Sequence, residues 1–185
     1  NIMSIKQALD FAYQAHDGQC RKGGKIPYIV HLLDVAKYLL YEEAPEAVVI
    51  AGILHDTLED SNTKKEDLRL QFGNEVVELV SFCTEEGNTV DAKNQKETWK
   101  TRKRHSIDSL KTATKNQALV FLADKLSNIT AIKEDQIFIG TEIWKRFNAP
   151  KEEIEWYYTS ILAGLGIVND TRMYRLLSIA IKDVF

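Results

Sequence analysis

Residues 55–61 read HDTLEDS and come directly after the apolar run VVIAGIL at 48–54. Pro45 precedes this run, and proline favours the first position of a helix, so the whole stretch predicts one mostly apolar helix over 46–60. A helix that is apolar on most of its sides is expected in the centre of a fold. The ionisable side chains that close it therefore need partners.

These ionisable side chains are His55, Asp56, Glu59 and Asp60. Each helical residue turns by about 100°, so residues at i,i+4 stack and all four fall within an arc of about 140°. Three carboxylates so close together repel one another and resist ionisation unless a cation neutralises them. The cation could be one divalent metal ion held by the adjacent histidine and aspartate. The lysines that follow at 64–65 are the alternative.

Two residues elsewhere could complete a metal site with His55 and Asp56. His31 lies at the start of an otherwise apolar helix, where a hydrogen-bonded core histidine is the alternative. Asp124 comes directly after six apolar residues, so it needs a metal ion, an arginine or a proton. Asn128 lies one helical turn later on the same face. The two histidines and two aspartates would offer a mixed donor set that suits Mn²⁺, Fe²⁺ or Zn²⁺.

The rest of the chain also reads as helices, which predicts an all-α fold. We expect residues 1–185 to form a single compact multi-helix bundle with the metal site in its centre. Only residues 136–139 read as extended, and the polar segment 84–97 reads as a loop that could close over a substrate. Further helices are predicted at 29–41, 74–82, 99–110, 117–133, 150–165 and 171–184.

Residues that favour helix ends support this division. Ser4 with Gln7 predicts a capping box, in which two side chains satisfy backbone N–H groups at the start of a helix. Thr63 with Glu66 predicts a second box. Gly73 predicts a helix stop, because glycine readily adopts the left-handed conformation found after a helix.

Composition limits the classes of function. The 185 residues carry a net charge of −3, which gives no reason to expect a nucleic-acid partner. The longest apolar runs are far shorter than the roughly 20 residues of a membrane span, so no membrane partner is expected. Cys20 and Cys83 form no CxxC or other metal-binding spacing, and they favour reduced thiols in a cytoplasmic protein. Composition indicates no particular oligomeric state.

The ordered set of the four candidate ligands, H…HD…D, resembles the signature of the HD-superfamily metal phosphohydrolases. The stretches AHDGQCRKGGKIPYIVH, LHDTLED, FGNEVVELV and LADKLSNI are similar to the hydrolase domain of Rel/SpoT-type alarmone enzymes, especially the stand-alone small alarmone hydrolases. The similarity covers roughly residues 15–132, and residues 150–185 resemble the C-terminal helices of such proteins. Because the match is to the hydrolase domain and not to the synthetase domain, the resemblance implies hydrolysis alone.

The resemblance implies removal of the 3′-pyrophosphate from (p)ppGpp, giving GDP or GTP and pyrophosphate, usually with Mn²⁺. The small-molecule partner would then be a nucleotide of the stringent response. The matching residues are His31, His55, Asp56 and Asp124 for the metal, Glu59 and Asp60 for the attacking water, and Arg21, Lys22 and Asn128 for the nucleotide.

The residue types agree with this chemistry. Glu59 can accept the proton of a water that a metal ion has made more acidic. Arg21 and Lys22 can stabilise the negative charge that develops on phosphate oxygens. Lys100 and Arg104 share one face of a predicted helix and could bind 5′-phosphates. The alternative for this second basic pair is a solvated helix face.

Other functions also fit the same metal site. One is a related HD phosphohydrolase that acts on (p)ppApp, on NADPH or on a nucleoside monophosphate. Another is a nucleotide sensor without turnover, although the complete ligand set and the intact Glu59-Asp60 pair argue against it. The chain continues with Ile129-Thr130-Ala131 where the bifunctional enzymes usually have Met-Arg-Thr, which alters the expected floor of the nucleotide pocket.

Overall fold

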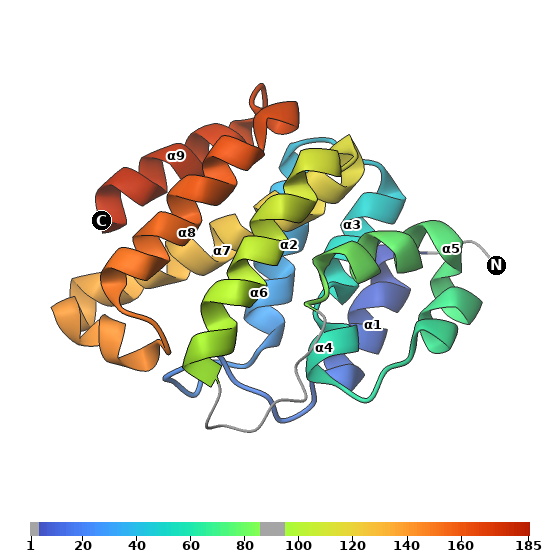
Figure 1. Cartoon of the computed structure of the whole chain (residues 1–185). Helices are drawn as coiled ribbons and strands as arrows, with labels where there is room; N and C mark the ends of the chain where they lie inside the picture. Colours follow the sequence, from blue (N-terminus) through green and yellow to red (C-terminus); the bar gives the residue numbers. More distant parts are fainter. Residues whose placement is uncertain (1–3, 86–94) are drawn as a thin grey trace.

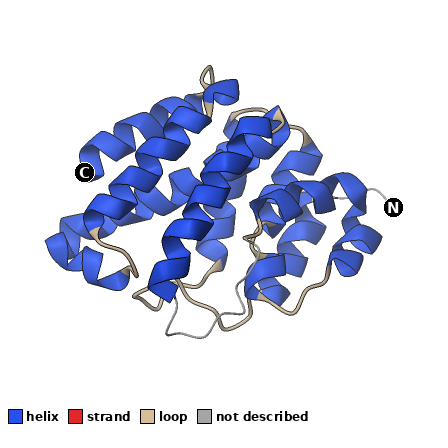
Figure 2. Ribbon diagram, in the orientation of Figure 1, coloured by secondary structure: helices blue, strands red, loops and turns tan. Residues whose placement is uncertain are grey.

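The computed structural model describes residues 4–85 and 95–185 of the chain. Within these residues the chain is helical with short connections and has no strand, so the predicted all-α fold is confirmed (Figure 2). The helices are α1 (Ile5–Ala15), α2 (Ile29–Tyr41), α3 (Glu46–Leu54), α4 (Thr57–Asp60), α5 (Lys65–Cys83), α6 (Gln95–Ser109), η2 (Leu110–Thr112), α7 (Lys115–Ile139), η3 (Gly140–Arg146), α8 (Lys151–Gly164), η4 (Gly166–Val168) and α9 (Arg172–Val184).

Helix α7 runs through the middle of the bundle and packs against α2, α3, α5 and α9 (Figure 1). Every residue from 48 to 54 of α3 is buried, which explains why this helix is apolar on all sides. Helices α6 and α8 pack against each other, and α8 also packs against α9. One continuous cluster of buried hydrophobic side chains joins these elements, from Ala8 in α1 to Val184 in α9.

The prediction of one continuous helix over 46–60 is wrong, because the chain turns at His55 and Asp56. Helix α3 ends at Leu54, and the short helix α4 begins at Thr57. The hydroxyl of Thr57 donates a hydrogen bond to the carbonyl oxygen of Leu54 at 2.7 Å and so satisfies a group that the ending helix leaves open. The two pairs predicted to stack at i,i+4 therefore do not share one helix face.

The capping box at the start of α1 is confirmed, since the backbone N–H of Gln7 donates to the Ser4 hydroxyl at 3.2 Å. The box predicted for Thr63 is placed one residue too early. Lys64 precedes the first residue of α5, and its backbone N–H donates to the Asp67 carboxylate at 2.9 Å. The Asp67 side chain therefore caps the start of α5 in the way that was predicted for Glu66.

Three further predictions concern helix ends. Gly73 interrupts α5 with a φ of 81°, in agreement with the predicted stop. The extended segment predicted at 136–139 is wrong, because α7 continues through it and ends where Gly140 adopts a φ of 55°. Most of the loop predicted at 84–97 lies outside the described residues, and α6 begins within it at Gln95.

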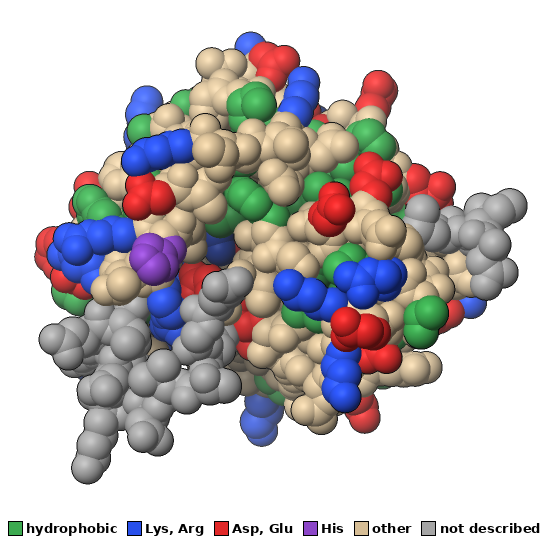
Figure 3. Space-filling model, turned by 45° about the vertical axis from the view of Figure 1, so that its right-hand side comes forward, with side chains coloured by type: hydrophobic (Ala, Val, Ile, Leu, Met, Phe, Trp, Pro, Cys, Tyr) green, Lys and Arg blue, Asp and Glu red, His purple; other side chains and the backbone are tan. Residues whose placement is uncertain are grey.

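The surface mixes charges of both signs. On the face that Figure 3 shows, lysine and arginine side chains are interspersed with aspartate and glutamate side chains. This agrees with a net charge close to zero. No helix within the described part of the chain is long and apolar enough to cross a membrane.

Candidate active site

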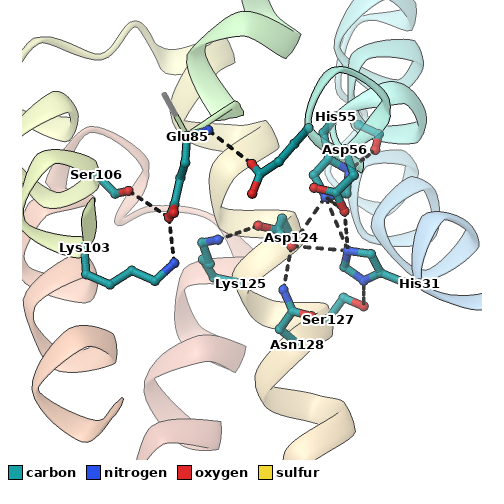
Figure 4. A network of polar contacts seen from close by, with 12 residues as sticks. His31, His55, Asp56, Glu85, Lys103, Ser106, Asp124, Lys125, Ser127 and Asn128 are labelled. Atoms are coloured by element: carbon teal, nitrogen blue, oxygen red, sulfur yellow. Dashed lines mark hydrogen bonds and ion pairs between the residues drawn. The ribbon is translucent and has the colours of Figure 1, made fainter. Parts of the chain in front are cut away.

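Four ligand atoms converge in the centre of the bundle, where α2, the turn between α3 and α4, and α7 meet (Figure 4). The Nε2 atoms of His31 and His55 lie 3.3 Å apart, and His55 Nε2 lies 2.9 Å from Asp56 Oδ2. Asp124 Oδ1 lies 3.2 Å from His31 Nε2 and 3.5 Å from His55 Nε2. Two imidazoles and two carboxylates from three parts of the chain therefore face one point. We call these four residues the HD cluster.

Contacts on the outer side of each imidazole orient the HD cluster. His31 Nδ1 lies 2.8 Å from the hydroxyl oxygen of Ser127, and His55 Nδ1 donates to the carbonyl oxygen of Gly52 at 2.8 Å. A carbonyl oxygen can only accept, so Nδ1 of His55 carries a hydrogen and Nε2 is the atom that faces the cluster. The Tyr28 hydroxyl donates to Asp56 Oδ2 and fixes that carboxylate as well. Such outer contacts are typical of metal-binding histidines and carboxylates.

The charges of the HD cluster stabilise one another despite burial. Burial lowers the pKa of His55, but the carboxylates of Asp56 and Asp124 outweigh it and raise this pKa well above its usual value. Burial also tends to raise the pKa of both carboxyls. For Asp56 the neighbouring His55, and for Asp124 first Lys125 and then His55, hold the pKa well below its usual value. The centre of the cluster therefore favours positive charge, and a metal ion can take the place of a proton there.

The spacing of the ligand atoms also fits a metal ion. Two ligand atoms that each bind one ion at about 2.1 Å lie about 3.0–3.4 Å from each other in tetrahedral or octahedral geometry. In the HD cluster the separations between each histidine Nε2 and the other ligand atoms run from 2.9 Å to 3.6 Å, and His31, His55 and Asp56 have ligand atoms that all lie within 4.8 Å of one another. The residues present therefore fit a divalent ion with mixed nitrogen and oxygen ligands.

A cavity of about 640 Å³ opens beside the HD cluster and has His31 in its wall. Arg21 Nη2 donates to Asn128 Oδ1 at 2.7 Å, and Asn128 Nδ2 donates to Asp124 Oδ1 at 2.6 Å, so hydrogen bonds connect the cavity wall to the cluster. The cavity has the size of a small-molecule site. The cationic side chains that line it are Arg21, Lys22, Lys103, Lys125 and Arg146.

Comparison with known proteins agrees with this geometry. The model of the family described as "HD domain" matches residues 8–147. The chain belongs to the HD domain family. Over 132 residues this HD domain protein is 36% identical to the guanosine-3′,5′-bis(diphosphate) 3′-pyrophosphohydrolase MESH1 of Xenopus tropicalis, and the match covers 70% of this chain and 69% of that protein. It is 31% identical to human MESH1 over 184 residues, which cover 98% of this chain and 92% of the human protein.

A solved structure described as a metazoan ortholog of SpoT that hydrolyzes ppGpp shares the fold. Its TM-score is 0.78 at 23% identity, and the superposition covers 97% of this chain and 96% of the other. Some bacterial relatives are longer. The chain is 34% identical to the corresponding enzyme of Borreliella burgdorferi over 132 residues, which are 70% of this chain and 19% of that protein.

The HD domain places Glu59 and Asp60 on α4, directly after the turn that carries His55 and Asp56. Glu59 Oε2 accepts a hydrogen bond from the backbone N–H of Glu85 at 3.1 Å. Partial burial and the nearby Asp56 carboxylate raise the pKa of Asp60. The two acids predicted to act on water therefore lie next to the HD cluster, although not on the same helix as predicted.

The structure does not bring the predicted pair Lys100 and Arg104 to the cavity of the HD domain. Lys100 Nζ donates to Glu153 at 3.2 Å, and the side chain of Arg104 is exposed. Among the described residues of α6, the cavity is lined by Trp99 and Lys103. These two residues are four apart and share a helix face, so the face that α6 turns toward the cavity differs from the predicted one.

Glu85 connects the site of the HD domain to α6, and sequence reasoning missed it (Figure 4). Besides the bond from its N–H to Glu59, its carboxylate accepts hydrogen bonds from Lys103 Nζ at 2.6 Å and from the Ser106 hydroxyl at 3.3 Å. Glu85 lies in a polar segment without periodicity, where no pattern singles it out. Lys125 was also missed, although its position directly after a buried aspartate is the signal that could have indicated it.

Glu85→Gln is expected to lower the free energy of unfolding at pH 7 by about 1–3 kcal/mol, because it weakens a charge-assisted hydrogen bond in a largely buried place. Burial tends to raise the pKa of Glu85, but Lys103 outweighs it and the pKa is lowered. The native carboxylate therefore stabilises the fold above its usual pKa and loses this effect as the pH falls through the lowered value. Denaturant unfolding at pH 7, 5 and 4 should show that the difference in free energy of unfolding between variant and wild type becomes smaller as the pH falls.

The exposed residue Glu75 provides the matched control for this measurement. Glu75→Gln is expected to stay within about 0.5 kcal/mol of wild type at every pH. If the difference in free energy of unfolding between Glu85→Gln and wild type stayed the same down to pH 4, the ionised carboxylate would not have the stabilising role given to it here.

Proposed function

We propose that this chain removes the 3′-pyrophosphate from (p)ppGpp by metal-dependent hydrolysis and releases GDP or GTP and pyrophosphate. The observation that carries the proposal is the HD cluster, whose ligand atoms converge beside a cavity whose wall includes Arg21 and Lys22. The MESH1 relatives, which bear the name of this activity and match most of the chain, support it. We further propose that the protein acts in the cytoplasm, as part of a stringent response.

The metal would be held by His31, His55, Asp56 and Asp124, and we propose Mn²⁺ as the ion because mixed imidazole and carboxylate ligands suit it. A divalent cation bound there would lower the pKa of a water molecule and polarise phosphoryl oxygens. The proton that leaves the attacking water needs an acceptor nearby.

We propose Glu59 as this acceptor, since it lies on α4 directly after the turn that carries His55 and Asp56, and its carboxylate is oriented by the Glu85 amide. Asp60, whose pKa is raised, would position the water with it. Arg21 and Lys22 would bind phosphate oxygens in the cavity. Asn128 would hold the Arg21 guanidinium in place through the hydrogen bond already described.

The test is incubation of Mn²⁺-loaded protein with ppGpp, ppApp, NADPH and dAMP, followed by chromatography of the products. The proposal expects pyrophosphate and GDP from ppGpp, faster than any other substrate is consumed. Chelation should stop the reaction and added Mn²⁺ should restore it. Turnover of dAMP alone, or of NADPH alone, would replace the proposal with another HD phosphohydrolase activity, and no turnover of any substrate would leave a nucleotide sensor.

A further inference from the structure

Gln19 joins the segment after α1 to α4, the short helix that carries Glu59 and Asp60. Its Nε2 donates a hydrogen bond to the backbone carbonyl oxygen of Asp60 at 2.7 Å. Its Oε1 lies 2.8 Å from Nδ1 of His16, the residue that directly follows α1. Because a carbonyl oxygen can only accept, the amide nitrogen of Gln19 faces Asp60 and its amide oxygen accepts from His16. The two hydrogen bonds therefore fix the orientation of this side chain.

His16 supports Gln19 from inside the fold. The imidazole is 4% exposed, and its Nε2 has no hydrogen-bond partner among the described residues, so its described polar contact is the one with Gln19. The ring also packs against Tyr28 at a centroid distance of 4.8 Å, and the Tyr28 hydroxyl donates to the Asp56 carboxylate. Contacts from one buried side chain therefore reach both ends of the segment from Asp56 to Asp60.

Helix α4 needs such support because it has only four residues. A single turn gains too few hydrogen bonds to offset the entropy of forming it, so it is not stable by itself. The carbonyl oxygens at its end also have no donor within the helix. The position of the Glu59 carboxylate beside the HD cluster therefore depends on contacts from outside α4, and the Gln19 amide makes one of them at Asp60.

The segment that carries Gln19 is itself well held. The backbone N–H of Arg21 donates to the carbonyl oxygen of Ile26 at 2.8 Å, and that of Tyr28 donates to the carbonyl oxygen of Gln19 at 3.0 Å. The backbone of residues 19–28 thus folds back on itself. It offers α4 a support that does not depend on the HD cluster.

We propose that Gln19 is a positioning residue, which holds α4 through the carbonyl oxygen of Asp60 so that Glu59 stays within reach of the attacking water. This inference rests on the proposed function, because Glu59 acts on water only if the chain is a hydrolase. Without Gln19 the ligand atoms of the HD cluster keep their own contacts, whereas the general base is displaced. A displacement of about 1 Å can cost about a hundredfold in rate.

The test uses Gln19→Met and Gln19→Glu in the Mn²⁺-loaded protein with ppGpp. Methionine keeps the length of the side chain and removes both hydrogen bonds. Glutamate can still accept from His16 but presents a carboxylate to the carbonyl oxygen of Asp60. Each variant is expected to lower kcat about ten- to hundredfold, with KM and Mn²⁺ affinity within about threefold of wild type. Gln14→Met and Gln14→Glu, at an exposed position of α1, are the matched controls.

A double-mutant cycle with Glu59→Gln distinguishes positioning from a general structural role. If Gln19 acts through Glu59, Gln19→Met should lower kcat by no more than about twofold once residue 59 is glutamine. An equal loss of kcat in both backgrounds would overturn the inference. Wild-type kcat in Gln19→Glu would overturn it as well, because the bond to Asp60 would then not be required.

Hydrogen exchange of the metal-free protein provides a measurement that does not depend on activity. The backbone N–H of Asp60, which donates to the carbonyl oxygen of Asp56 at 2.8 Å, should exchange about tenfold faster in Gln19→Met, while the amides of α3 keep their wild-type rates. Unchanged exchange at Asp60 would refute the inference. Absence of ppGpp turnover by the wild type would refute the proposed function instead, and it is detected before any variant is compared.

Discussion

Asp124→Ala is expected to abolish Mn²⁺ binding and to reduce turnover of ppGpp below about one thousandth of wild type. The carboxylate lies 3.2 Å from His31 Nε2 and 3.5 Å from His55 Nε2, so its loss removes one ligand and the negative charge that draws a cation to a buried place. Isothermal titration with Mn²⁺ would measure the first effect, and release of pyrophosphate the second.

The control has to separate lost metal binding from a lost fold. Asp124→Ala leaves Lys125 largely buried without its carboxylate, which is expected to destabilise the protein by about 3–5 kcal/mol. The double variant Asp124→Ala, Lys125→Met removes this unpaired charge and should recover most of the stability but none of the metal binding. Asp183→Ala, which breaks the exposed Lys133 ion pair to the same helix α7, should keep both metal and activity. Metal binding by the double variant at wild-type affinity would exclude Asp124 as a ligand.

The HD cluster could be predicted because each of its members is an ionisable side chain within or directly after an apolar segment of the sequence. An aspartate after six apolar residues in a central helix has no reason to be there without a partner, and Asp124 is 7% exposed. The turn at His55 could not be predicted, because the pattern of the segment remains compatible with a helix. At the turn the Thr57 hydroxyl bonds to Leu54 O, and residues far away in sequence contact the side chains of His55 and Asp56.

The cavity was harder to predict than the cluster because it depends on how helices are rotated about their axes. Lys100, Arg102, Lys103 and Arg104 put cations on every side of α6, so the sequence does not distinguish the side that faces α8 from the one that faces water. The packing of Trp99 and Lys103 against Tyr157 decides it. The segment predicted to be extended at 136–139 was also misjudged, because α7 continues through it although Ile137 and Phe138 are exposed.

Glu59→Gln is expected to keep Mn²⁺ binding and to lower kcat for ppGpp about a hundred- to ten-thousandfold, the range for removal of a general base. The amide keeps the shape of the side chain and can still accept the hydrogen bond from the Glu85 N–H, so the backbone around α4 should not move. What is lost is the capacity to take a proton from the attacking water. KM should change little, because Glu59 is not assigned to phosphate binding.

Three measurements separate this role from a structural one. Titration of Glu59→Gln with Mn²⁺ should give the wild-type stoichiometry, whereas Asp124→Ala is expected to bind no Mn²⁺. The pH profile of the residual activity should lose the plateau that an ionised general base produces, because the water then loses its proton to solvent hydroxide and the rate keeps increasing with pH. Glu66→Gln, a change of the same type at an exposed position of α5, should leave kcat unchanged. If Glu59→Gln retained full kcat, the proton would have to leave by another group, and Asp60, the neighbouring acid with a raised pKa, would be the next candidate.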